Sequence, residues 1–285
     1  MSICPSFNPV PTQPAVGYSS RYAGMPRGLT ADPRLIHSGL GWASVPFYAD
    51  LTDTLGPSRM IENSADLAEL QRAIAAIVPG AALETVQLPG DHGLRLVLLE
   101  AAYPQHLLDG DAVIKIMNEP MYWAFCWAAG QCLAQFLTEQ PHYVAGKRVL
   151  DFGAGSGVVA LAAARAGARS VVACDSDPLA CTASRLNAAL NGVAIETIAD
   201  LEQLTGAADV VLAADVLYDR GNLHWLQAFL NVAPCVLLAD SRIRDFSEPG
   251  YSLLTTRSSH TLPDLDESGE FRQVRLYLGE RQGDD

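Results

Sequence analysis

A chain of 285 residues, 49% of them hydrophobic, can bury one large core, or one core with a smaller module beside it. Its formal net charge of −13, with no cluster of Lys or Arg, disfavours nucleic acid as a partner. No apolar run reaches the length of about 18 residues that spans a membrane. Met1 to Gln13 lack the basic and apolar pattern of a secretory signal, which favours a cytoplasmic protein.

The six cysteines show no zinc-binding pattern. No two are spaced as C-x-x-C, and no two histidines have the spacing of zinc ligands. Several cysteines stand in apolar runs, so we expect buried free thiols in a reducing compartment and no metal site.

The N-terminal part of the chain predicts an irregular arm and then a helix. Residues 1–30 are rich in Pro, Ser and Gly, which is typical of a poorly ordered arm. Ser64 can cap a helix that ends at Pro79-Gly80. The apolar residues of this helix fall on one face, and they are Leu67, Leu70, Ile74, Ile77 and Val78.

Two strands are expected after this helix. The first covers 94–100, and the second covers 111–117 behind a turn at Asp109-Gly110. Together with the helix they predict a small α+β accessory module over residues 31–118.

From residue 119 onward, strands and helices alternate. Continuously apolar segments read as strands at 148–152, 170–175, 195–200, 209–215 and 234–240. Helices are expected at 122–137, 157–167, 178–191 and 219–231. Two final strands, at 251–257 and 271–279, have no helix between them. Such strands are typical of a parallel sheet whose two faces are both covered by helices, so we predict an α/β domain over 119–285.

The turn after the first of these strands carries three glycines. The run 149–157 reads Val-Leu-Asp-Phe-Gly-Ala-Gly-Ser-Gly, and such a strand–turn–helix brings bare backbone close to a nucleotide-like ligand. The dinucleotide fingerprint is G-x-G-x-x-G, whereas here Gly157 comes one place early. The acid Asp151 followed by Gly153, Gly155 and Gly157 resembles motif I of the class I, seven-strand S-adenosylmethionine-dependent methyltransferases. In that family the turn holds the methionine end of the cofactor.

Acids follow the next two strands, at the edge where a ligand binds in α/β sheets. Asp175 stands 18 residues past Gly157 and can accept hydrogen bonds from both ribose hydroxyls. A dehydrogenase places an acid similarly, so Asp175 indicates a ribose and not a reaction. For Asp200 the resemblance implies contact with the adenine amino group, and a solvated acid at a strand end is the alternative.

The fourth strand is followed by Asp215-Val216-Leu217-Tyr218. This run resembles the D/E-x-x-Y signature of the family 16 lysine methyltransferases. The resemblance implies that Asp215 contacts both cofactor and reacting amine, and that Tyr218 lines the substrate slot as a catalytic residue. A lysine with its ordinary pKa of about 10.4 must lose a proton to attack, and an aromatic enclosure favours the neutral form. The alternative is a helix cap at Asp215 and a core aromatic at Tyr218.

The segment 120–131, Pro-Met-Tyr-Trp-Ala-Phe-Cys-Trp-Ala-Ala-Gly-Gln, precedes the glycine turn. It is similar to a segment of the electron-transfer-flavoprotein β-subunit lysine methyltransferases, although Ala128-Ala129 replace Pro-Gly. Trp127 and Gln131 are expected on one helical face. The resemblance implies that Trp127 contacts cofactor and substrate, and that Trp123 contacts substrate. An apolar docking helix is the alternative.

The resemblance covers residues 115–280 and implies a Rossmann-like, seven-stranded sheet, mostly parallel with an antiparallel last strand. It implies S-adenosylmethionine as cofactor, S-adenosylhomocysteine as product, and Asp151 with the three glycines among the cofactor contacts. The expected reaction is N-methylation of a lysine in a protein, and a small-molecule methyltransferase remains open.

Other classes of protein fit less well. A serine hydrolase elbow needs G-x-S-x-G, but Ala154 stands two places before Ser156. A P-loop needs G-K-[ST], which is absent after the glycines. An NAD(P) oxidoreductase needs another glycine spacing and a second half of the sheet. An inactive binding module is hard to reconcile with the complete set of glycines and acids.

Overall fold

The computed structural model describes residues 61, 64–90, 93–103, 120–218, 220–243, 246–264 and 268–281. All of them belong to one compact unit, residues 48–285. The arm expected at 1–30, the strand expected at 111–117 and Cys4 lie outside the described residues. No helix in the described part of the chain combines the length and the apolar character needed to cross a membrane.

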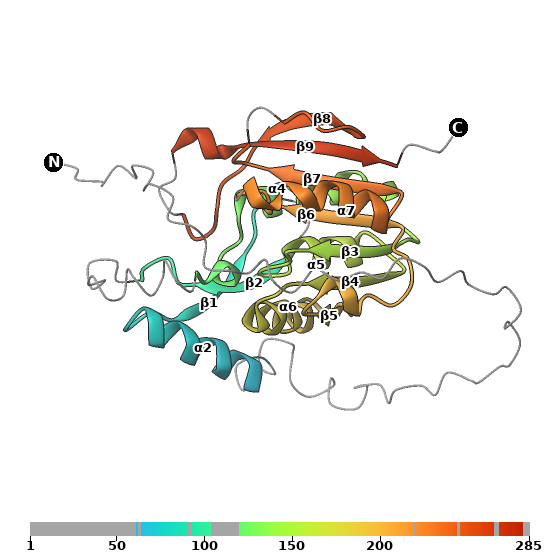
Figure 1. Cartoon of the computed structure of the whole chain (residues 1–285). Helices are drawn as coiled ribbons and strands as arrows, with labels where there is room; N and C mark the ends of the chain where they lie inside the picture. Colours follow the sequence, from blue (N-terminus) through green and yellow to red (C-terminus); the bar gives the residue numbers. More distant parts are fainter. Residues whose placement is uncertain are drawn as a thin grey trace, which may run out of the picture. The chain divides into compact units, whose positions relative to one another are not determined.

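A seven-stranded sheet forms the centre of this unit (Figure 1). Its strands are β3 (Arg148–Phe152), β4 (Ser170–Cys174), β5 (Glu196–Ile198), β6 (Val210–Ala214), β7 (Cys235–Asp240), β8 (Tyr251–Ser258) and β9 (Gln273–Glu280). Their order across the sheet is β5-β4-β3-β6-β7-β9-β8. Strands β3 to β7 pair in parallel, whereas β9 pairs antiparallel with both β7 and β8. The predicted mostly parallel sheet with an antiparallel last strand is confirmed.

Helices cover both faces of the sheet because neighbouring residues of each strand point to opposite sides. Val149 of β3 packs in a core cluster with Leu133 and Leu161, and Leu150 packs in a second cluster with Phe229. Leu133, Leu161 and Phe229 belong to α4 (Ala128–Glu139), α5 (Val158–Arg165) and α7 (His224–Val232). A fourth helix, α6 (Pro178–Asn191), follows β4. Short 3-10 turns are η2 (Tyr122–Ala124), η3 (Pro141–Tyr143), η4 (Leu201–Gln203), η5 (Arg220–Leu223) and η6 (Gly269–Arg272).

Helix α6 has the bounds that the sequence predicts, because both of its ends are encoded locally. Asp177 caps the first turn, where its carboxylate accepts a hydrogen bond from the Leu179 N–H at 2.8 Å. Pro178 occupies the first helical position, which suits its fixed φ. Gly192 ends the helix in the left-handed conformation, with φ of 64°.

The single helix expected over 122–137 is wrong. The chain forms η2, passes through an extended Phe125, and begins α4 only at Ala128. Cys126 exchanges two backbone hydrogen bonds with Leu262, at 2.8 and 2.9 Å, and this long-range bridge interrupts the helix. Trp127 therefore precedes α4 as its N-cap residue, and it does not share a helical face with Gln131.

The N-terminal elements are helix α2 (Ala65–Ile77) and an antiparallel hairpin of β1 (Leu83–Gln87) and β2 (Arg95–Leu99). Ser64 caps α2 as predicted, because its Oγ accepts a hydrogen bond from the Leu67 N–H at 3.1 Å. The sequence analysis missed β1, whose five residues are all exposed or half-buried and carry no strong apolar signal.

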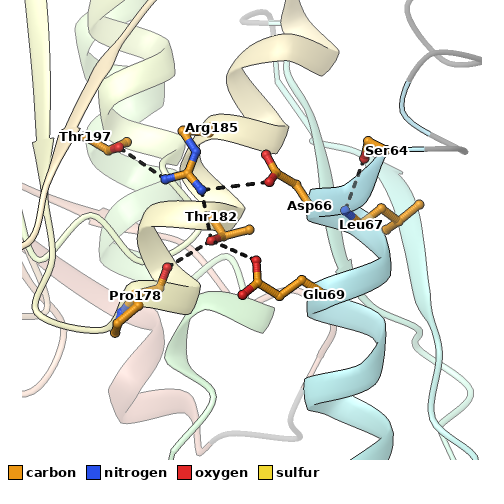
Figure 2. A network of polar contacts seen from close by, with 8 residues as sticks. All are labelled: Ser64, Asp66, Leu67, Glu69, Pro178, Thr182, Arg185 and Thr197. Atoms are coloured by element: carbon orange, nitrogen blue, oxygen red, sulfur yellow. Dashed lines mark hydrogen bonds and ion pairs between the residues drawn. The ribbon is translucent and has the colours of Figure 1, made fainter.

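Polar side chains join α2 to α6 (Figure 2). Arg185 donates to the Thr182 hydroxyl at 3.1 Å, and its guanidinium lies 3.8 Å from the Asp66 carboxylate. The Thr182 hydroxyl lies 3.5 Å from the Glu69 carboxylate. Beneath this network, Leu70 of α2 and Leu186 of α6 share one core cluster. The boundary between an accessory module over 31–118 and a domain over 119–285 stays a prediction.

Candidate functional site

The carboxyl ends of strands β3 to β7 lie at one edge of the sheet, because these strands run parallel. In α/β sheets this edge is where ligands bind. The acids Asp175, Asp200 and Asp215, which the sequence places after strands, all lie at this edge. Gly153 and Ser241 follow the ends of β3 and β7 at the same edge.

The glycine turn, residues 153–157, needs glycine at all three positions. Gly153, Gly155 and Gly157 have φ values of 70°, 53° and 81°, which strain any other residue. A Cβ at Gly153 would lie 2.8 Å from Val216 Cγ1, and one at Gly157 would lie 2.9 Å from Ser184 Oγ. A Cβ at Gly155 would have the carbonyl oxygen of Tyr122 as its nearest neighbour, 3.9 Å away. The middle of the glycine turn therefore has room for a ligand against bare backbone.

Asp151 lies behind the glycine turn and not on its surface. The side chain is 1% exposed, and its Oδ2 accepts a hydrogen bond from the Ala160 N–H, in the first turn of α5, at 2.9 Å. Burial raises the pKa of Asp151 to about 7. Asp151 thus joins α5 to β3 by a hydrogen bond. Its predicted contribution to cofactor binding would be indirect, through the position of the glycine turn that precedes α5.

Asp175 connects the end of β4 to the glycine turn. Its Oδ2 accepts from the Gly155 N–H at 2.9 Å, and its Oδ1 accepts from the Asp177 N–H at 3.0 Å. Burial raises the pKa of Asp175, against which the two backbone donors act. A carboxylate offers about four acceptor sites, so this half-buried group keeps capacity for two more donors, as two ribose hydroxyls require.

Asp200 lies beyond the end of β5, where it caps η4. Its Oδ1 accepts from the Glu202 N–H at 2.9 Å, and the residue is half-buried. The strand-end position agrees with the prediction, and the contact with adenine stays a prediction.

Asp215 holds the ends of two strands to the start of a helix. Its Oδ1 accepts from the Ser241 N–H at 2.9 Å and from the Ser241 hydroxyl at 2.7 Å. Its Oδ2 accepts from the Ala129 N–H, in the first turn of α4, at 3.2 Å. Among the described residues, Asp215 is the one non-glycine with a positive φ, 51°. Strain of this kind concentrates at functional sites, and burial also raises the pKa of Asp215.

Three aromatic residues, Tyr122, Trp127 and Tyr218, form an aromatic group beside Asp215. The Tyr122 ring centroid lies 5.5 Å from that of Tyr218 and 5.7 Å from that of Trp127. Trp127 Nε1 donates to the Tyr122 carbonyl oxygen at 2.9 Å, the same oxygen that would lie nearest a Cβ at Gly155. Tyr122 and Tyr218 are 42% and 58% exposed, so the structure argues against a core position for Tyr218.

Trp123 requires a correction. It is 1% exposed and packs in the core cluster with Leu70 and Leu186, so its indole has no surface to offer to a substrate. Its neighbour in the short η2 turn, Tyr122, is 42% exposed instead. Tyr122 is thus the exposed aromatic residue here, although the sequence analysis expected Trp123 to contact the substrate. The only sequence signal for Tyr122 was its place beside Trp123.

Asp240, the last residue of β7, and the residues that follow it also lie at this edge of the sheet, and they were not among the predicted contacts. Asp240 is 1% exposed, and its Oδ1 accepts from the N–H groups of Arg242 and Ile243 at 2.7 and 2.6 Å. Burial, and then the nearby charge of Asp215, raise the pKa of Asp240 to about 6. The Arg242 guanidinium carbon lies 4.4 Å from the Phe271 ring centroid and 5.9 Å from that of Trp127. The single acid at the end of this strand, Asp240, was the available sequence signal for this segment.

Replacing Asp151 by Asn is expected to flatten the pH dependence of stability. The carboxyl titrates near 3.8 when unfolded and near 7 when folded, so the folded protein binds more protons between these values. The free energy of unfolding then falls as pH rises through this window, by at most about 1.4 kcal/mol per pH unit from this group. Urea denaturation of wild type and Asp151→Asn across the window measures both slopes. Equal slopes would contradict a buried, proton-binding Asp151.

The described residues contain no group of three or more His, Cys, Asp and Glu side chains that could hold a metal ion. The polar groups at the carboxyl edge of the sheet are instead backbone groups of the glycine turn and separate carboxylates, which accept hydrogen bonds. This set suits an organic ligand with hydroxyl and amino groups.

Comparison with known proteins finds that the chain is similar to methyltransferases. Residues 131–219 match the family model described as ribosomal protein L11 methyltransferase (PrmA). The electron transfer flavoprotein beta subunit lysine methyltransferase of Danio rerio is 38% identical over 152 residues, which cover 50% of this chain and 59% of that protein. The ribosomal protein L11 methyltransferase of Pelotomaculum thermopropionicum is 43% identical over 133 residues, which cover 44% of this chain and 42% of that protein.

The similarity to the Rattus norvegicus flavoprotein-subunit lysine methyltransferase is of the same size, 38% over 154 residues, which cover 50% of this chain and 60% of that protein. The chain thus spans 60% or less of the length of these curated relatives. The matched region contains the glycine turn, Asp175, Asp215 and Tyr218. With this similarity, and with the sheet order β5-β4-β3-β6-β7-β9-β8, the chain has the class I S-adenosylmethionine-dependent methyltransferase fold.

Proposed function

We propose that the protein is an S-adenosylmethionine-dependent methyltransferase that N-methylates a lysine side chain of a protein and releases S-adenosylhomocysteine. The observation that carries this proposal is the juxtaposition at the carboxyl edge of the sheet. The open middle of the glycine turn lies between Asp175, which keeps acceptor capacity, and the exposed aromatic group beside Asp215.

The cofactor fits the residues that surround the glycine turn. S-adenosylmethionine, when bound, supplies an electrophilic methyl group. Backbone groups of residues 153–157 would hold its methionine end, which carries no phosphate, and Asp175 would accept the two ribose hydroxyls. Asp200 would reach the adenine. Asp151 would contribute by holding α5, since its own carboxylate is buried.

Asp215 and the aromatic group would receive the lysine. Three donors already occupy Asp215, so its Oδ2 keeps about one acceptor site, enough for a single amine N–H. That hydrogen bond would direct the nitrogen lone pair, while a bound substrate that covers Tyr122, Trp127 and Tyr218 would exclude water and so disfavour the charged ammonium form. S-adenosylmethionine would supply the methyl group and leave as S-adenosylhomocysteine, while Asp215 would hold the lysine nitrogen, which would release one proton on gaining the methyl group.

A protein substrate is supported by charge, exposure and similarity. The net charge of −13 attracts a lysine-rich, basic partner. Tyr122 and Tyr218 are exposed, where a side chain of another protein could reach them. The relatives are named for a flavoprotein subunit and a ribosomal protein, both of which are proteins. We also propose a reducing compartment, the cytoplasm, because the five described cysteines are free and four are buried.

The direct test is to incubate an extract of the source organism with purified enzyme and S-adenosylmethionine carrying a labelled methyl group. We expect label in a protein band, at a lysine located by mass spectrometry. Label confined to small molecules would replace the protein substrate with a metabolite. Absence of label, together with absence of cofactor binding in calorimetry, would remove the methyltransferase assignment.

Asp175→Ala is expected to weaken S-adenosylmethionine binding at least tenfold. Two hydrogen bonds to a charged group are lost, each of which contributes about 1.5–3 kcal/mol. Asp209→Ala is the matched control, because Asp209 also accepts a backbone N–H, from Arg148 at 2.7 Å, but precedes β6 at the opposite edge of the sheet. Calorimetry that finds equal affinities for the two variants would contradict the ribose contact.

Tyr218→Ala is expected to lower turnover at least tenfold while the affinity for S-adenosylmethionine and the melting temperature stay near those of wild type. The side chain is 58% exposed, so its removal costs little packing. Leu253→Ala is the control, since Leu253 is similarly exposed, at 55%, on the distant strand β8. Full activity of Tyr218→Ala would exclude Tyr218 from the acceptor site.

A further inference from the structure

Two asparagines of α6 bind the backbone of β2 from the side. Asn191 Nδ2 donates to the Arg95 carbonyl oxygen at 2.6 Å, and its Oδ1 accepts from the Arg95 N–H at 3.0 Å. Four residues earlier, Asn187 Oδ1 accepts from the Val97 N–H at 2.7 Å. These side-chain amides satisfy the free edge of β2 as a neighbouring strand would do.

Asn187 differs from Asn191 in what its other end binds. Its Nδ2 donates to the carbonyl oxygen of Ser156, inside the glycine turn, at 2.9 Å. The residue is 0% exposed, so both hydrogen bonds are made without competition from water. A single amide therefore connects the hairpin β1–β2 to the glycine turn.

Ser184, one turn earlier in α6, holds the same turn at a second carbonyl. Its hydroxyl donates to the Gly155 carbonyl oxygen at 3.2 Å. In a planar trans peptide the N–H points opposite to the C=O, so this bond also turns the Ser156 N–H away from α6. The side chains of α6 thus fix the orientation of two successive peptide groups in the glycine turn.

We propose that Asn187 is a positioning residue for the cofactor, through which the hairpin β1–β2 sets the shape of the glycine turn. Asn187 touches neither the cofactor nor the substrate, and it acts on the Ser156 carbonyl. The inference rests on the proposed function only for its affinity readout, because the shape of the turn can be followed without any ligand.

The physical reason lies in the geometry of the amide. The donor and the acceptor of Asn187 lie on one rigid plane, so the Val97 N–H and the Ser156 carbonyl are held at a fixed separation. Without this amide, both buried groups lose their partner, and the turn gains freedom in the peptide that follows Ser156. Loss of Asn191 frees the hairpin at Arg95 but leaves the bond to Ser156 in place.

The test compares Asn187→Ala with its matched control Asn191→Ala at a temperature at which both are folded by circular dichroism. Two quantities are measured: hydrogen exchange of the peptide that contains residues 153–157 in cofactor-free protein, and the dissociation constant of S-adenosylmethionine by calorimetry. We expect Asn187→Ala to speed exchange in the turn and to weaken binding at least tenfold. Asn191→Ala should leave both within about twofold of wild type while it lowers the melting temperature.

A second variant keeps the test decisive if Asn187→Ala does not fold. Asn187→Asp, measured at a pH at which its carboxyl is ionised, retains the acceptor for the Val97 N–H and removes the donor to Ser156, so the same loosening of the turn is expected. Equal exchange rates in the turn for the Asn187 and Asn191 variants would overturn the inference. A wild-type protein that binds no S-adenosylmethionine would overturn the proposed function, and the exchange comparison would still decide the role of Asn187.

Discussion

The glycine turn is held from both sides by hydrogen bonds to its own backbone, and the site depends on this arrangement. Asp175 accepts a hydrogen bond from the Gly155 N–H. Ser184 and Asn187 donate hydrogen bonds to the carbonyl oxygens of Gly155 and Ser156, respectively. A segment with three positive φ values has a large conformational entropy when free. Fixing it beforehand spares a ligand that cost on binding, which is how preorganised sites gain affinity.

The carboxylates at the same edge are stabilised by backbone donors, against their own burial. Burial raises the pKa of Asp151, Asp175, Asp215 and Asp240, and each receives at least one backbone N–H in return. Buried acids grouped in this way lower stability at neutral pH, since ionising each of them in the fold costs more than in water. A fold retains such a group where its chemistry is needed, which is the reason that strongly shifted acids mark functional sites.

The sequence predicts those parts of the fold whose signals are local. Helix α6 begins and ends as expected because Asp177, Pro178 and Gly192 encode its ends, and the glycine spacing locates the turn. The break before α4 depends on Leu262, more than a hundred residues away, and no local pattern shows it. No local pattern shows either that Trp123 is buried and its neighbour Tyr122 exposed. Long-range pairing overrides helix propensity in such segments.

Asn187 and Asn191 show how a functional connection can be visible in a sequence without being recognised. Asn187 is buried in α6 and Asn191 is half-buried, and a buried amide is costly unless each of its polar atoms has a partner. Two such residues four apart indicate a run of backbone groups that no strand covers. The backbone that these amides bind belongs to β2, and the helix that carries them begins just after its N-cap Asp177, whose N–H donates to Asp175. Asn187 thus joins the hairpin β1–β2 to the glycine turn by hydrogen bonds, although the two lie 50 or more residues apart in the chain.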